Sequence, residues 1–413
     1  MKSLQKLLIF FALFFALLAF IIGMTGGTRF SVAGISISMT SWNSPLWLCF
    51  VCLGIKLLYQ YREPLKARRK KFLFASILIS FFLLILGILG EFLARYYLPP
   101  DPYSTIFQIN PHPWIQFSLV PSVKTSVRID NGTKVPFQVN SLGYRGPEIG
   151  EKKLAQQRVI CLGDSFLMGK DVADQETLPA KLQHFLGNNA QVINAGCGGW
   201  NTVQEYYDLK ERGLALQPDS VLLFYVMNDT HFRKKLNLWR RLKETVTLNS
   251  ALYRFLRTRW IQWEERLRSQ VSVALETNPS SNEEALLENP TQASMKDWNE
   301  DFQEGKKGWE SSKEALQNIQ SLCRERNIPF LIILYPWLVQ LDENYPFKPV
   351  HEKLSQFCHQ QEIPFLDLFP YYKGYSAKEL WVGRTDSHPN VQGQEIAAKA
   401  VAQKLQQLGW LKK

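Results

Sequence analysis

One stretch, Arg158-Val-Ile-Cys-Leu-Gly-Asp-Ser-Phe-Leu-Met-Gly169, most restricts the fold that this chain can adopt. It begins with the apolar run 159–162, breaks at Gly163, and meets a second break at its final glycine. A short apolar run bounded by turn residues is typical of a buried parallel strand. Open α/β sheets bind their ligands just beyond the carboxyl ends of such strands. The pattern therefore predicts that Ser165 is displayed at a strand end.

Strand-like and helix-like segments alternate from this stretch to the end of the chain. Strands are expected near residues 158–162, 191–195, 220–226, 329–335 and 363–368. Helices are expected at about 177–187, 201–213, 306–326, 349–361 and 391–408. This alternation implies right-handed βαβ crossovers and a parallel sheet covered by helices on both faces.

A serine hydroxyl is a weak nucleophile unless a base takes its proton and donors stabilise the oxyanion. Suitable residue types follow in order: the glycine-rich turn 192–202, Asn228-Asp229 after a strand, and Asp386-Ser-His388 before the last helix. Each has a structural explanation when taken singly, because Ser165 suits a helix N-cap and the other segments suit turns. Their joint occurrence favours a catalytic site.

These blocks resemble those of the SGNH (GDSL-like) hydrolase family over roughly residues 135–410. The matching positions are Gly163-Asp164-Ser165, Gly196, Asn228-Asp229, and Asp386 with His388. Two positions depart from the family pattern: Val226 stands where the third block has glycine, and the aspartate lies two residues before the histidine instead of three. The resemblance implies a flavodoxin-like three-layer α/β/α sandwich with a central parallel sheet.

The resemblance also implies a role for each matching residue. Ser165 is the expected nucleophile, His388 the general base, and Asp386 the residue that orients the imidazole. The backbone N–H groups of Ser165 and Gly196, with the side-chain amide of Asn228, are expected to form the oxyanion hole. The mechanism implied is an acyl-enzyme pathway that needs no cofactor.

No metal site is predicted. The combination of Asp229, His231 and Asp386 lacks a recognisable ligand spacing. The six cysteines likewise show neither metal-ligand spacing nor a disulfide framework, and most are expected to be small buried side chains.

Residues 1–98 are expected to form a membrane region with three transmembrane helices, at about 7–24, 45–60 and 72–94. The first and third segments are almost wholly apolar over the roughly 17–25 residues that a span needs, whereas the middle one is shorter and contains Lys56. Six Lys and Arg residues crowd the loop 60–71. The positive-inside rule places that loop in the cytoplasm and, with three crossings, the rest of the chain outside.

The remaining chain divides into a linker with a β-rich leader, 99–150, and the hydrolase domain, 151–413. In the leader, Asn131-Gly132 between two strand-like runs predicts a hairpin. The phrase Asn140–Glu148 leads into the first sheet strand as a turn-rich connector, and no chemistry is assigned to it.

The hydrolase domain carries a basic amphipathic insertion at about 230–304. Residues 232–268 contain eleven Lys and Arg against three Glu, interleaved with leucines and tryptophans at helical spacing. This composition suits a helix in the membrane interface that contacts anionic lipid, a lid over the site, or a helix packed on the domain with a solvated basic face. The expected topology argues against a nucleic-acid partner. Residues 276–301 are polar and acidic, typical of a flexible connector.

The sequence thus predicts a membrane-anchored, multi-pass protein whose extracytoplasmic serine esterase domain cleaves O-acyl esters of envelope polysaccharide or lipid. One alternative is an O-acyltransferase that passes the acyl group to a polysaccharide hydroxyl. The other is a non-catalytic envelope scaffold, favoured if the departures at Val226 and Asp386 disable the site.

Overall fold

In a computed structural model, the chain forms two compact units. One unit comprises Met1–Pro99 with Ser250–Asn282, and the other Pro100–Asn249 with Glu283–Lys413. The structure describes residues 8–17, 28–32, 35–39, 49, 51–56, 62–97, 105–128, 133–153, 156–232, 235–257, 259–260, 300–383 and 386–410.

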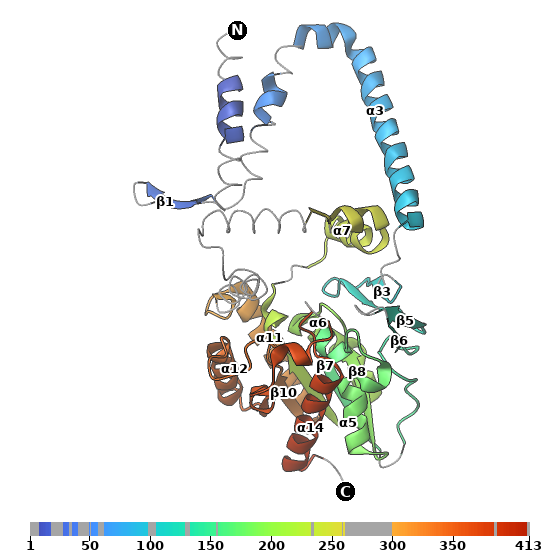
Figure 1. Cartoon of the computed structure of the whole chain (residues 1–413), viewed down its shortest axis with the longest axis vertical. Coiled ribbons are helices and arrows are strands. Elements are labelled where there is room, and N and C mark those ends of the chain that lie inside the picture. The colour runs from blue at the N-terminus through green and yellow to red at the C-terminus, as the bar shows by residue number, and fades with distance from the viewer. Residues whose placement is uncertain are drawn as a thin grey trace. The chain divides into compact units, whose positions relative to one another are not determined.

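A five-stranded sheet forms the centre of the second unit (Figure 1). Its strands are β7 (Gln157–Gly163), β8 (Ala190–Gly196), β9 (Ser220–Tyr225), β10 (Phe330–Leu334) and β11 (Phe365–Asp367). All neighbours pair in parallel, in the order β11-β10-β9-β7-β8. Every residue of β9 and β10 is buried, as expected for strands covered on both faces. The five predicted strands are confirmed.

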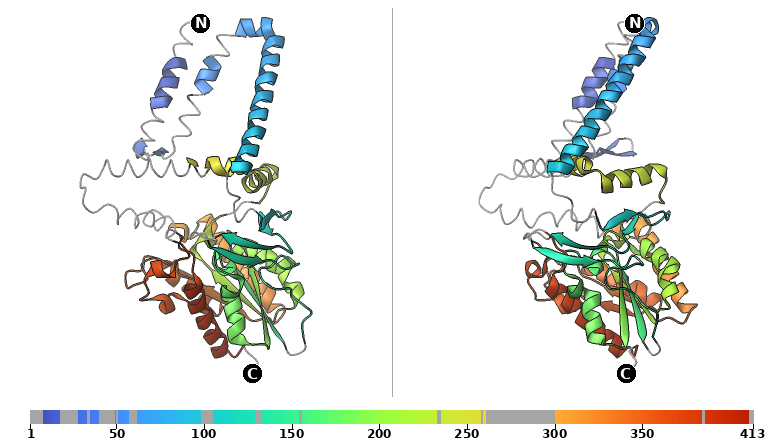
Figure 2. Two further views of the ribbon diagram at one scale, coloured as in Figure 1. Left: turned by 45° about the vertical axis from the view of Figure 1, so that its right-hand side comes forward. Right: turned by 90° about the vertical axis from the view of Figure 1, so that its right-hand side faces the viewer.

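Helices cover both faces of this sheet (Figure 2). On one face α5 (Leu178–Leu186) packs against α14 (Val391–Gln407), and on the other α6 (Thr202–Glu211) packs against α11 (Lys307–Arg324). The helix α12 (Lys348–Gln360) connects β10 to β11. The strand order reverses direction between β7 and β9, which is where open α/β sheets bind ligands. The predicted flavodoxin-like α/β/α sandwich is confirmed.

The leader contains two short antiparallel pairs. β3 (Phe107–Ile109) pairs with β4 (Phe117–Leu119), and β5 (Lys124–Arg128) pairs with β6 (Lys134–Gln138). The second pair confirms the predicted hairpin, and the predicted turn residues Asn131 and Gly132 lie outside the described residues.

A second apolar core joins this leader to the ends of β7 and β8. Its buried members are Ile106, Ile115, Leu119, Val127, Phe137, Val139, Met168, Cys197 and Trp200. The leader therefore packs against the edge of the sheet that carries Ser165.

Among the described residues, one helix is long and apolar enough to cross a membrane. This is α3 (Arg62–Tyr97), whose stretch Leu73–Tyr97 has a mean hydropathy of 2.7 and is not buried within the structure. A shorter apolar helix spans Leu8–Leu17. The first and middle predicted spans lie partly outside the described residues, so three crossings stay a prediction. A short hairpin that was not predicted, β1 (Thr28–Val32) with β2 (Ile35–Met39), lies between them in the sequence.

The insertion begins with the amphipathic helix α7 (Leu238–Asn249), which has no fully buried residue. The helix contacts β3, and the Arg241 guanidinium donates to Pro111 O. All three predicted alternatives for this helix stay open. In the first unit, Glu91 of α3 accepts hydrogen bonds from Ser250 Oγ at 2.7 Å, Ala251 N at 3.0 Å and Leu252 N at 3.1 Å. This carboxylate thereby caps the helical segment that follows α7 in sequence. Most of the acidic connector 276–301 lies outside the described residues.

Candidate active site

Ser165 follows β7 directly. Asp164 caps the short helix α4 (Ser165–Met168), accepting a hydrogen bond at 2.8 Å from the backbone N–H two residues on. Gly163 cannot carry a side chain without rearrangement, because a Cβ there would lie 2.8 Å from a Cβ of α4. Gly169 ends the helix with φ 82°, a conformation that favours glycine. The helix cap is therefore Asp164, and Ser165 takes the first helical position at the carboxyl edge of the sheet.

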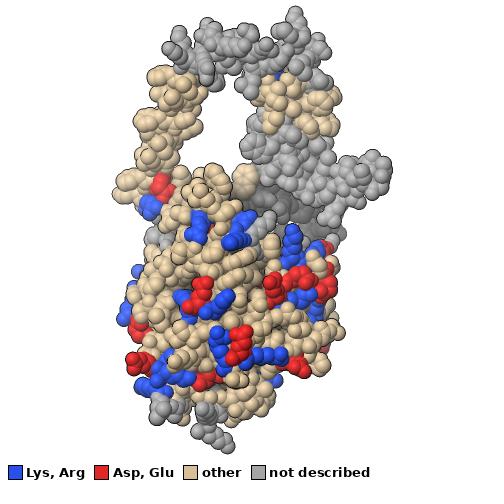
Figure 3. Space-filling view, turned by 180° about the vertical axis from the view of Figure 1, so that it is seen from behind, with Lys and Arg blue, Asp and Glu red and all other residues tan. Residues whose placement is uncertain are grey.

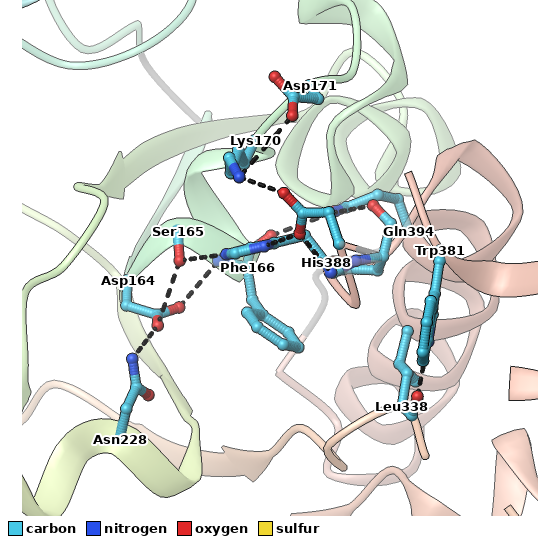
Figure 4. Close-up of polar contacts among 12 residues, drawn as sticks. Asp164, Ser165, Phe166, Lys170, Asp171, Asn228, Leu338, Trp381, His388 and Gln394 are labelled. Carbon is cyan, nitrogen blue, oxygen red and sulfur yellow. Dashed lines mark hydrogen bonds and ion pairs between the residues drawn. The ribbon is translucent and has the colours of Figure 1, made fainter. Parts of the chain in front are cut away.

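The structure brings the three predicted catalytic side chains together (Figure 4). Ser165 Oγ lies 2.8 Å from His388 Nε2, and His388 Nδ1 lies 2.5 Å from Asp386 Oδ1. A carboxylate at Nδ1 favours the tautomer with its proton on that nitrogen, which leaves Nε2 free to accept the serine proton. The arrangement has the geometry of an activated serine.

The short Asp-x-His spacing lets one carboxylate oxygen make two bonds. Asp386 Oδ1 accepts from the His388 backbone N–H at 3.1 Å as well as facing the imidazole. The other oxygen, Oδ2, pairs with Lys170 Nζ. Burial alone raises the pKa of Asp386, but the hydrogen bond from His388 and the Lys170 ammonium together hold that pKa well below its ordinary value. The carboxylate is therefore ionised at neutral pH, as its orienting role requires.

Phe166 of α4 supports the imidazole from the side. Its ring centroid lies 5.1 Å from that of His388 and 5.4 Å from that of Trp337. The fully buried Gln394 of α14 donates to Phe166 O at 3.0 Å and accepts from Leu178 N at 2.8 Å. One amide thus joins α14 and α5 to the nucleophile helix. Sequence analysis did not identify it, because a glutamine in a helical pattern is usually a surface residue.

The third block places its amide beside the nucleophile turn. Asn228 Nδ2 donates to Asp164 Oδ2 at 2.8 Å, and the amide retains a second N–H. Burial raises the pKa of Asp164, and the hydrogen bond from Asn228 opposes that rise. Val226 has φ −125° and ψ 161°, an extended conformation that any residue adopts. The departure from glycine at Val226 therefore has no backbone consequence.

Gly196, a predicted oxyanion donor, also has a packing role. Its N–H donates to Asn194 Oδ1 at 3.0 Å in this structure. A Cβ at Gly196 would lie 2.4 Å from Met168 N, which shows how closely β8 approaches the nucleophile helix. The oxyanion hole made of Ser165 N–H, Gly196 N–H and the Asn228 amide stays a prediction.

Asp229 holds two elements together near the site. Its carboxylate accepts from Thr202 Oγ1 at 3.0 Å and from Val226 N at 2.7 Å, joining the end of β9 to the start of α6. Glu205 is also fully buried, and neither of its carboxylate oxygens has a hydrogen-bond partner among the described residues. Across the part of the chain that the structure describes, no three His, Cys, Asp or Glu side chains are grouped to hold a metal ion.

Arg145 is a second supporting residue that sequence analysis missed. Its guanidinium is buried and donates to Met168 O, to Gly169 O and, at 2.7 Å, to Val172 O. It also pairs with Asp174 at 2.9 Å. Cations at helix C-termini stabilise the exposed carbonyls. The connector 140–148, to which no chemistry was assigned, thus supplies the cation that holds the turn after the nucleophile.

Comparisons with known proteins identify the family. The GDSL-like Lipase/Acylhydrolase family matches residues 161–396, more than half of the chain. No curated protein matches this chain.

Three solved structures to which the chain is similar are an acetylxylan esterase from Geobacillus stearothermophilus, a carbohydrate acetylesterase family member from Sinorhizobium meliloti and a lipolytic protein of the G-D-S-L family from Veillonella parvula. Identities are 14%, 12% and 14%, with TM-scores of 0.37, 0.36 and 0.33. The matches cover 63%, 61% and 60% of this chain and 100%, 99% and 97% of those chains. On the family match over residues 161–396, the chain belongs to the GDSL-like lipase/acylhydrolase family and is a serine hydrolase with the SGNH fold.

Proposed function

We propose that this protein is a membrane-anchored, extracytoplasmic esterase that hydrolyses O-acyl esters of envelope polysaccharide or lipid. The observation that carries the proposal is the unbroken chain from Ser165 Oγ through His388 to Asp386, with separations of 2.8 and 2.5 Å. The same geometry argues against the non-catalytic scaffold, because neither departure from the family pattern separates these groups.

In this mechanism Ser165 Oγ attacks the ester carbonyl carbon while His388 Nε2 takes the hydroxyl proton. The negative charge moves to the carbonyl oxygen, where the predicted donors, Ser165 N–H, Gly196 N–H and the Asn228 amide, stabilise it. Collapse of the tetrahedral intermediate breaks the C–O bond to the alcohol, and His388 returns the proton to that oxygen. Water then attacks the acyl-enzyme with the same base, releasing the acid and restoring the serine.

Labelling with a fluorophosphonate probe tests this assignment in the full-length, detergent-solubilised protein. Wild type is expected to label, and Ser165→Ala and His388→Ala are expected to lose labelling. Ser376→Ala is the matched control, since Ser376 is exposed and has no part in the site. Labelling that persists in Ser165→Ala, or is absent from folded wild type, contradicts the proposal and favours the non-catalytic scaffold.

Hydrolysis and acyl transfer differ only in which nucleophile meets the acyl-enzyme. Acetylated oligosaccharide and short-chain phospholipid are the substrates to compare, with free acid and acylated sugar measured together. Release of acid at a rate unaffected by added oligosaccharide supports the esterase. Acylated oligosaccharide that grows at the expense of free acid supports the O-acyltransferase instead.

The proposed location rests on α3 and on the charge at its start. The stretch Leu73–Tyr97 follows a segment rich in Lys and Arg, expected as a loop, that forms the first turns of α3. By the positive-inside rule, we expect this segment to face the cytoplasm and the hydrolase domain to lie outside. Alkaline phosphatase fused after Lys413 should be active and green fluorescent protein should be dark there, since each reports one side of the membrane. The same pair fused after Met39 tests the multi-pass prediction. A fluorescent C-terminal fusion would place the hydrolase domain in the cytoplasm and contradict the proposed location.

We further propose that α7 lies on anionic lipid. Leu238 and Trp239 are 79% and 76% exposed, and Arg240 and Lys243 stand on the same helix. An amphipathic helix with exposed Trp and Leu and basic neighbours binds the bilayer interface. Basic and acidic side chains are interspersed over the face of the hydrolase unit that Figure 3 shows. That face therefore has no uniformly basic surface that would bind anionic lipid in place of α7.

Flotation with vesicles of phosphatidylglycerol and phosphatidylcholine tests this contact. Arg240→Gln with Lys243→Gln is expected to weaken binding of the hydrolase unit, because each basic group near an anionic surface contributes about 1 kcal/mol. The control pair Lys134→Gln with Lys378→Gln removes the same charge from exposed positions elsewhere. Equal loss in both pairs indicates a general charge effect and refutes a specific role for α7.

A further inference from the structure

We infer that Lys170 is a positioning residue for the catalytic aspartate. This role rests on the proposed catalytic site. Lys170 Nζ pairs with Asp386 Oδ2, the oxygen that does not face His388. The side chains of Lys170 and Asp386 are 27% and 21% exposed, so solvent reaches the pair only partly. Figure 4 shows Lys170 approaching from the nucleophile side of the site.

The short spacing between Asp386 and His388 explains why a second contact matters. Oδ1 bonds both the backbone and the imidazole of His388. Both bonds come from His388, two residues along the chain, so they do not hold the carboxylate relative to the rest of the fold. A cation from another part of the fold fixes the second oxygen and therefore the plane of the carboxylate.

The backbone that carries Lys170 is itself held in place. Lys170 N donates to Ser165 O at 3.1 Å, directly after the left-handed turn at Gly169. Arg145 binds the carbonyls on both sides, those of Met168 and Gly169 before it and that of Val172 after it. The nucleophile and the cation that orients the aspartate thus move as one rigid turn.

Lys170 also supplies positive charge in an otherwise acidic surrounding. The other ionisable groups that the structure places around this pair are Asp171, 3.8 Å from Lys170, and Asp164 at the end of β7, which interacts with His388. Both are acidic, so among the described residues Lys170 is the cation that holds Asp386 in place against their repulsion.

The test is p-nitrophenyl acetate hydrolysis by the full-length protein, with kcat and KM measured separately. Lys170→Met is expected to lower kcat/KM about fivefold, the equivalent of about 1 kcal/mol for a partly exposed ion pair. The loss is expected in kcat with KM unchanged, because Lys170 acts through Asp386. Lys170→Arg retains the charge and should keep the wild-type values of both. Lys181→Met, which removes a lysine paired with Glu176 outside the site, should change neither.

The outcomes separate this inference from the proposed function. If wild type shows no Ser165-dependent labelling, the catalytic site and the role of Lys170 both fall. If wild type labels but Lys170→Met keeps the wild-type kcat, only the role of Lys170 is refuted. The same holds if Lys170→Arg is as impaired as Lys170→Met. Lys170→Gln, which removes charge while retaining a donor, takes the place of Lys170→Met if that variant does not fold.

Discussion

Replacing Arg145 by Met is the sharpest test of how the fold supports the site. The change leaves three backbone carbonyls and the Asp174 carboxylate without their buried cation. Removing one partner of a buried pair costs about 3–5 kcal/mol. For a domain of this size, 1 kcal/mol corresponds to roughly 2–4 °C in Tm, so Tm is expected to fall by roughly 6–20 °C.

A second effect should appear below the unfolding transition. Because Arg145 holds the turn that follows Ser165, fluorophosphonate labelling is expected to slow in the folded variant. Arg158→Met is the matched control. Arg158 is a buried arginine that bonds Gln191 Oε1, Leu216 O and Gly150 O at 2.7–2.8 Å, but it lies at the opposite end of β7. It should lose comparable stability without slowing labelling.

Thermal unfolding by circular dichroism and labelling rates at a temperature where both variants are folded give the two readouts. Equal labelling rates in Arg145→Met and Arg158→Met would refute the positioning role and leave Arg145 a stabilising residue only. A fall in Tm of less than about 3 °C in Arg145→Met would refute the magnitude, because it corresponds to no more than about 1.5 kcal/mol.

Three further predictions concern Asp386, Glu205 and Gly196. Asp386 has a lowered pKa in the folded state, so its contribution to stability is present above its unfolded pKa and is lost only as pH falls toward the folded value; acid titration monitored by circular dichroism should show Asp386→Asn losing this acid-range dependence. The pKa of Glu205 is raised because the side chain is buried and near Asp229, so the folded state binds its proton more tightly than the unfolded state does. The stability of the fold therefore falls as the pH rises from the unfolded pKa of Glu205 toward its higher folded pKa. Glu205→Gln should therefore be about 1–3 kcal/mol more stable than wild type at pH 8, with the difference vanishing below about pH 4; a constant difference in urea unfolding contradicts this. Gly196→Ala should lose about 1–3 kcal/mol through overpacking against backbone, whereas Gly198→Ala, whose Cβ would make contacts of 3.4 Å, should unfold near wild type.

Much of the sheet could be predicted because its signal is local. The buried runs that became β7, β9 and β10 are continuous apolar segments bounded by turn residues, and the helices between them repeat with the helical period. Ser165 could be expected at the ligand-binding edge because it follows a parallel strand. Its partnership with His388 and Asp386 was implied by the resemblance of the short blocks to a known family.

The supporting residues could not be predicted in this way. Arg145 and Gln394 bind backbone carbonyls, which every residue carries, so no side-chain pattern marks their targets. Lys170 meets Asp386 across 216 positions of sequence. Gly196 lies in a predicted block, yet the direction of its N–H depends on the side chain of Asn194 and on the path of β8.

The amino-acid sequence by itself determined the order of the strands and helices and the apolar stretch within 72–94, because both depend on composition and spacing within short segments. The roles proposed for Ser165, His388 and Asp386 came from the resemblance of short blocks to a known family. Only the tertiary structure decided that Asp164 is the cap, that Asn228 is oriented by Asp164, and that cations from two other segments hold the catalytic turn and the aspartate. The physical reason is that hydrogen-bond direction and charge pairing require distances of about 3 Å between groups far apart in sequence, and only chain packing produces them.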